Sequence, residues 1–138
     1  MERKDRVVNY SLLYWMLTAL FCFALTLGGV TELLEVPMQV TGIKALGYPL
    51  YILPLLGLAK LLGVTAILYG KHARLKEWAY AGITFDLLGA VYSHAMRAQF
   101  KEAVPAFVLM ILCLVTYRVW RKDVHAERAI AMQFQSEG

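Results

Sequence analysis

The stretch that decides the fold is the apolar segment 49–69, PLYILPLLGLAKLLGVTAILY, which carries one charged residue, Lys60, near its centre. An apolar run of about 20 residues has the length that an α-helix needs to cross the hydrocarbon core of a bilayer. A lysine in the middle of such a helix costs roughly 2.5–3.5 kcal/mol on insertion scales. The segment therefore predicts a transmembrane helix, and Lys60 predicts a polar or charged partner on a neighbouring helix.

Three further apolar runs of similar length occupy residues 10–30, 78–96 and 104–120. The whole chain is 59 % hydrophobic and 17 % charged, against about 45–50 % and about 25 % in a typical soluble domain. Only helices and closed barrels satisfy their backbone inside a bilayer, and these runs lack the alternation of barrel strands. The predicted fold is therefore all-α, an integral membrane four-helix up-and-down bundle over residues 1–122, followed by a C-terminal tail, 123–138.

The distribution of lysine and arginine predicts the orientation, because these residues concentrate in cytoplasmic segments. With the N-terminus inside, most of the cationic side chains fall on the inner side: Arg3, Lys4, Arg6, Lys71, Arg74, Lys76, Arg118, Arg121, Lys122 and Arg128. The outer segments then hold only Lys44, Arg97 and Lys101. We expect a multi-pass protein of a bacterial-type inner membrane, with both termini in the cytoplasm and the long connection 31–48 outside.

Asp86 is the predicted partner of Lys60. Lys60 lies 10 residues before Gly70, and Asp86 lies 10 residues after Lys76, so the two are equally far from the short turn that joins their helices. At about 1.5 Å per residue, antiparallel helices place both side chains about 15 Å from that turn. Opposite charges at one depth on adjoining helices offset the cost of burying each of them.

Two interpretations of this pair remain open at the level of sequence. Small residues, Gly57 and Gly63, flank Lys60, and such faces let membrane helices approach closely. The pair is then either an architectural contact, which need not add net stability, or part of a polar site for a ligand or a proton. Ionisable residues inside a membrane are functional candidates by default.

Other polar residues gather toward the predicted outer side of the membrane. Glu32 ends the first predicted span, Tyr48 precedes the second, and His94 follows Asp86 by about two turns. Together with Lys60 they are candidates for the lining of an outward-facing pocket. The alternative for Glu32, Tyr48 and His94 is simple contact with water or lipid head groups at the membrane surface.

Several kinds of site are not indicated. Only one histidine, His94, lies in a predicted span, whereas a bis-histidine haem needs two. No histidine and cysteine spacing typical of a metal site is present, nor a phosphate-binding loop or nucleophile elbow. Cys22 and Cys113 lie far apart without a C-x-x-C motif. We therefore predict no metal and no intrinsic cofactor, and the scattered positive charge predicts no nucleic-acid partner.

Three sequence blocks closely resemble the DoxX-like family of small four-helix membrane proteins: AKLLG at 59–63, RLKEWAYAG at 74–82 and the Asp86…Ser93-His94 pattern that follows. The similarity extends over about residues 10–120. It implies an up-and-down bundle of four helices, and it places the family's charged positions on Lys60 and Asp86. Named members of the wider group are small membrane subunits of quinol oxidase and thiosulfate:quinone oxidoreductase complexes, and distant relatives resemble assembly chaperones of membrane proteins.

The leading functional expectation is a small subunit of a quinone-linked respiratory or sulfur-redox complex, and so at most an accessory subunit of an oxidoreductase. A lipophilic, quinone-like ligand would bind near the pair, with Lys60 donating to a ligand oxygen, Asp86 keeping Lys60 charged, and His94 exchanging protons with the outer side. The alternatives are a non-enzymatic assembly or scaffold protein, and a small transporter or proton pathway. The expected partners are the lipid bilayer and either redox-complex subunits or further copies of the chain.

Overall fold

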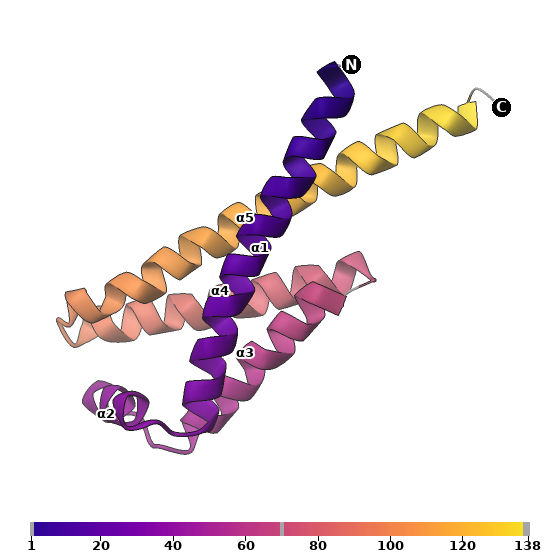
Figure 1. Ribbon diagram of the computed structural model, residues 1–138. Helices are drawn as coiled ribbons and strands as arrows, with labels where there is room; N and C mark the ends of the chain where they lie inside the picture. The colour runs from indigo at the N-terminus through magenta and orange to yellow at the C-terminus, as the bar shows by residue number, and fades with distance from the viewer. Residues whose placement is uncertain (1, 70, 137–138) are drawn as a thin grey trace.

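The fold is described by a computed structural model that covers residues 2–69 and 71–136, almost entirely as helix. In chain order the helices are α1 (Glu2–Leu33), α2 (Pro37–Leu46), α3 (Ile52–Tyr69), α4 (Ala73–Met96) and α5 (Phe100–Ser136) (Figure 1). The predicted all-α class is therefore confirmed. Within the predicted tail, 123–138, helix α5 continues as far as Ser136.

Three helices of the described chain are long and apolar enough to cross a membrane: Ser11–Leu33, Ile52–Tyr69 and Phe100–Lys122. They correspond to the first, second and fourth predicted spans. The third predicted span, 78–96, lies within α4, which is long enough but less apolar, since it carries Asp86 and a charged first turn. Length and composition alone thus support three spans, and the count of four stays a prediction.

The outward faces of the helices are apolar. On α1 the side chains of Leu12, Met16, Leu20, Phe23 and Leu27 are all exposed. An apolar surface of this extent is rare on a soluble monomer. It is the expected surface of helices whose surroundings are lipid tails, which are as apolar as leucine.

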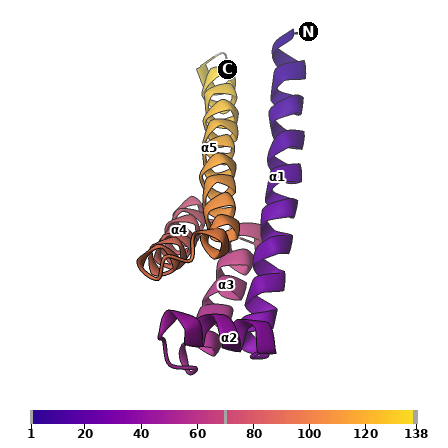
Figure 2. The same cartoon turned by 90° about the vertical axis from the view of Figure 1, so that its left-hand side faces the viewer.

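The four long helices contact one another in a ring, α1 to α3, α3 to α4, α4 to α5 and α5 back to α1. The most extensive contacts join α1 to α3 and α4 to α5. The helices are splayed rather than parallel, because α4 lies across α1 in Figure 1 and is seen almost end-on in Figure 2, where α1 runs the length of the view. This divergence leaves space between α3 and α4.

Helix α2 lies within the connection 31–48, which the sequence presents simply as a long loop. Pro37 begins the helix, and its fixed backbone angle suits that position. Gly47 ends it in the left-handed conformation, with φ of 88°, and its N–H donates to the carbonyl of Lys44 at 2.9 Å. Figure 2 shows α2 lying across the ends of α1 and α3, so that it covers one end of the bundle.

The main buried core lies away from α2, where α1, α3, α4 and α5 meet. Phe21 and Cys113 are fully buried there, and the ring of Tyr80 stacks on those of Phe21 and Trp120. Cys22 and Cys113 are both buried free thiols. This packing joins the helices on the side of the molecule away from α2.

Candidate functional site

Three charged side chains from three helices meet inside the bundle. The ammonium Nζ of Lys60 on α3 lies 2.8 and 2.7 Å from Oε1 and Oε2 of Glu32 on α1, and 3.1 Å from Oδ2 of Asp86 on α4. Their side chains are 12 %, 13 % and 18 % exposed, in the order Lys60, Glu32, Asp86. The predicted pairing of Lys60 with Asp86 is confirmed. We call this group the ionic triad.

The sequence pattern predicts Asp86 but not Glu32 as a partner of Lys60. Glu32 was expected among the polar residues near the membrane surface, yet it makes the two shortest contacts of the triad. The available signal is the pair Gly29 and Gly57, which lie three residues before Glu32 and Lys60 respectively. If these two glycines mark the contact between their helices, the residues one turn further along meet as well.

The structure places the two glycines in backbone contact. A Cβ atom added to Gly57 would lie 2.5 Å from the carbonyl oxygen of Gly29 and 2.8 Å from the backbone nitrogen of Leu33. Only glycine allows helices α1 and α3 to approach so closely. This contact fixes the height at which Glu32 faces Lys60.

On the other side of α3, Gly63 makes room for a side chain of α4. A Cβ atom on Gly63 would lie 2.8 Å from Cδ1 of Ile83. This contact lies one turn from the Lys60–Asp86 pair on each helix, so it holds α3 and α4 together beside the pair. The triad is thus positioned by two glycine contacts, one on each flank of α3.

A cavity of about 420 Å³ adjoins the triad on the side of α2, and we call it the Tyr48 cavity. All five of the candidate site residues line it: Glu32, Tyr48, Lys60, Asp86 and His94. Its remaining walls are mainly apolar, with Ile43 and Leu46 from α2, Leu53 and Leu56 from α3, and Phe85 from α4. The structure therefore brings together every residue that the sequence proposes for a pocket; binding at that pocket stays a prediction.

Hydrogen bonds tie the polar rim of the Tyr48 cavity together. The hydroxyls of Tyr48 and Ser93 lie 2.9 Å apart, and Nε of Arg97 donates to the carbonyl of Leu46 at 3.1 Å. Nδ1 of His94 donates to Oε1 of Gln99 at 3.1 Å, so Nε2 is left for other contacts. The first two bonds fasten α2 and the loop before α3 to the end of α4, and the third ties the end of α4 to the loop that follows it.

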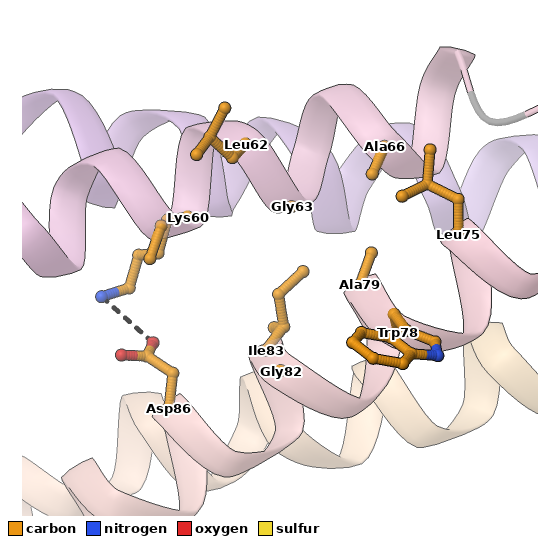
Figure 3. A pocket seen from close by; sticks show the side chains of 11 residues that line it. Lys60, Leu62, Gly63, Ala66, Leu75, Trp78, Ala79, Gly82, Ile83 and Asp86 are labelled. Carbon is orange, nitrogen blue, oxygen red and sulfur yellow. Dashed lines mark ion pairs between the residues drawn. The ribbon is translucent and has the colours of Figure 1, made fainter.

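A second cavity, of about 290 Å³, lies between α3 and α4 on the other side of the triad. We call it the Trp78 cavity. Figure 3 shows the Lys60–Asp86 contact at one end of it and Leu75 and Trp78 at the other. Lys60 and Asp86 line both cavities. The ion pair between α3 and α4 thus lies at the boundary between the two cavities.

The chemistry of the triad is that of a hydrogen-bond acceptor. A lysine ammonium has three N–H donors, and three carboxylate oxygens lie within 3.1 Å of Lys60 Nζ. With all three groups ionised, two carboxylates and one ammonium carry a formal charge of −1. Within the part of the chain that is described, no group of three or more His, Cys, Asp or Glu side chains is arranged to hold a metal ion.

Comparison with known proteins agrees with the sequence blocks and the apolar helices. The model of the DoxX-like family matches residues 16–116, a range that contains all five candidate residues. A Bacillus subtilis (strain 168) protein, "Uncharacterized protein YdgD", is 30 % identical over 90 residues, which are 64 % of this chain and 76 % of that one. No solved structure matches the chain. With its apolar helices and the family match over most of its length, this membrane protein belongs to the DoxX-like family.

Proposed function

We propose that the protein holds a lipophilic ligand in the Tyr48 cavity, as a small membrane subunit of a quinone-linked respiratory or sulfur-redox complex. One observation carries the proposal: a cavity of about 420 Å³ with apolar walls opens onto the charged triad. Ligand sites are typically about 300–1,000 Å³, mostly apolar, with a few polar groups that fix the orientation of the ligand. A quinone or quinol has the matching form, with an apolar tail and a polar ring.

The proposal includes a topology of four membrane spans, with α4 as the third. Its 24 residues make a helix about 36 Å long, which is enough to cross the hydrocarbon core. Asp86 pairs with Lys60 instead of facing lipid, so its charge does not oppose the placement of α4 in the hydrocarbon core. The lysine and arginine distribution supports a bacterial-type inner membrane with both termini in the cytoplasm, and the Tyr48 cavity then faces the outer half.

The experiment is to purify the protein in mild detergent, extract it with organic solvent and measure bound lipophiles by absorbance and mass spectrometry. Gly89 lines the Tyr48 cavity, and a Cβ atom there would have no heavy atom within 4 Å. Gly89→Leu therefore fills the cavity without a backbone clash. Gly82 is equally open and lines the Trp78 cavity but not the Tyr48 cavity, so Gly82→Leu is the matched control.

A near-stoichiometric quinone or other lipophile in the wild type and in Gly82→Leu, lost from Gly89→Leu, is the expected result. Retention of the lipophile in Gly89→Leu would place binding elsewhere and overturn the proposal. An empty wild-type protein that also fails to take up added quinone would do the same.

A second candidate is a non-enzymatic assembly or scaffold protein, and the completeness of the triad favours it. Lys60 joins α1 and α4 to α3 through hydrogen bonds to Glu32 and an ion pair with Asp86, as expected of a contact that fixes which helix packs where. On this view, Lys60→Met combined with Glu32→Gln and Asp86→Asn keeps the cellular phenotype, provided that the variant folds. Loss of the phenotype in a stably folded triple variant would exclude a purely architectural triad.

A proton pathway is supported by the two cavities that meet at Lys60 and Asp86. It requires water to reach Asp86 in the membrane. A carboxyl-reactive carbodiimide added to native membranes should then label Asp86, with Asp86→Asn as the blank. The absence of labelling, judged by mass spectrometry of the α4 peptide, counts against this role.

A further inference from the structure

The ammonium of Lys60 is surrounded by carboxylate oxygens within the triad. It donates to both oxygens of Glu32, at 2.8 and 2.7 Å, and forms an ion pair with Oδ2 of Asp86 at 3.1 Å. A ligand oxygen in the Tyr48 cavity must therefore compete with these carboxylates for Lys60. This differs from the expectation that Lys60 donates to a ligand oxygen, because that expectation allowed Lys60 a single partner.

The two carboxylates, in contrast, can still accept hydrogen bonds from a ligand. An ionised carboxylate has about four lone-pair sites for hydrogen bonds, and among the described residues only Lys60 donates to or pairs with Glu32 and Asp86. Figure 3 shows the second oxygen of Asp86 on the side away from the rest of the Trp78 cavity. Both residues line the Tyr48 cavity, so the triad offers hydrogen-bond acceptors to a ligand there.

The net charge of the triad also favours a ligand group that donates hydrogen bonds. With all three groups ionised, two carboxylates around one ammonium leave one negative charge in excess, at a depth where charge is expensive. A ligand group that carries a positive charge, or that donates hydrogen bonds, offsets this excess. A carbonyl oxygen placed there would face carboxylate oxygens and gain no hydrogen bond.

We propose that the Tyr48 cavity selects lipophiles whose head group donates hydrogen bonds to Glu32 and Asp86, and that it rejects head groups which only accept them. The hydroxyls of a quinol and the N–H groups of an alkylammonium share this donor chemistry, whereas the carbonyls of a quinone lack it. The inference rests on the proposed function, in which this cavity holds a lipophile.

The test uses three probes on the full-length protein in detergent, kept anaerobic. Decylubiquinol and decylubiquinone have the same tail and differ in whether the ring oxygens donate or only accept hydrogen bonds. Dodecylammonium represents the second class of donor, a lipophilic amine that carries a positive charge. The bound probe is measured by ultrafiltration and chromatography, with Gly89→Leu as the filled-cavity blank. An unpaired buried polar group discriminates ligands strongly, so a donor probe should bind at least roughly tenfold more tightly than decylubiquinone.

Each outcome supports or overturns the inference that the cavity selects donors. A donor probe that binds roughly tenfold more tightly than decylubiquinone supports it. The donor that binds more tightly then shows whether the ligand is a quinol or an amine. Decylubiquinone that binds as tightly as both donors overturns the inference while leaving the proposed function in place. Failure of all three probes to exceed the Gly89→Leu blank overturns both.

Selectivity should also change in a predictable way when the triad loses one charge. In Glu32→Gln the excess negative charge is gone, and Lys60 regains an N–H donor. The preference for decylubiquinol over decylubiquinone should therefore fall toward parity. Glu35→Gln makes the same change of charge at an exposed position outside the cavity lining and should leave the preference unchanged. An unchanged preference in Glu32→Gln would contradict the role given to the carboxylates.

Discussion

Gly29 and Gly57 are in backbone contact one turn before Glu32 and Lys60, and this contact aligns the two charged residues. A Cβ atom on Gly29 would lie 3.0 Å from the carbonyl oxygen of Gly57 and 3.2 Å from Cβ of Lys60. The ionic triad therefore depends on how closely two helices approach, and not only on the residues that form it.

The glycine contact predicts a difference between neighbouring substitutions. Gly57→Ala places a methyl group 2.5 Å from a backbone oxygen, so α1 and α3 must separate, and we expect a loss of about 1–3 kcal/mol in the free energy of unfolding. Gly28→Ala, next to Gly29, meets nothing within 4 Å and should be neutral or slightly stabilising. Denaturation in detergent compares the two; equal effects would contradict the contact.

Removal of the central cation should be more damaging than removal of a surface cation. Lys60→Met leaves Glu32 and Asp86 facing each other without a counter-charge, and breaking a buried ion pair on one side typically costs about 3–5 kcal/mol. The exposed Lys44 provides the control, Lys44→Met, which should shift the thermal midpoint very little. Equal midpoints for the two variants would show that the triad contributes nothing to folding.

The end of α2 gives a third prediction. Gly47 has φ of 88°, and the guanidinium of Arg97 packs directly against it, so Gly47→Ala is strained and displaces Arg97 from the carbonyl of Leu46. We expect a loss of about 1 kcal/mol and weaker retention of a ligand in the Tyr48 cavity. Gly42→Ala, within α2 and in open space, is the control. Full stability of Gly47→Ala would show that the α2 cap is not held in this way.

The topology can be tested on the two sides of α4. Lys71 and Lys101 are exposed at opposite ends of it, and Cys22 and Cys113 are buried, which keeps background labelling low. If α4 spans the membrane, a membrane-impermeant maleimide applied to intact cells labels Lys101→Cys, and labels Lys71→Cys only after lysis. Labelling of both from outside, or of neither, would exclude α4 as a span.

The sequence by itself determined the helical membrane class, the positions of three spans and the pairing of Lys60 with Asp86. The reason for the last is local, because a short turn joins α3 to α4 and fixes the register of the two helices. The apolar runs fixed the spans in the same local way, since length and hydropathy suffice for a helix in lipid.

Only the tertiary structure decided that Glu32 is the nearer partner of Lys60, that two carboxylates surround the ammonium, and that two cavities meet at the triad. Helices α1 and α3 are joined through α2, so no short turn fixes their register; the Gly29–Gly57 contact does so across space. The cavities arise from the divergence of α3 and α4, which depends on packing against α1 and α5. The charge and hydrogen-bonding character of the site therefore come from the packing of the helices, although the residues that line it can be found in the sequence.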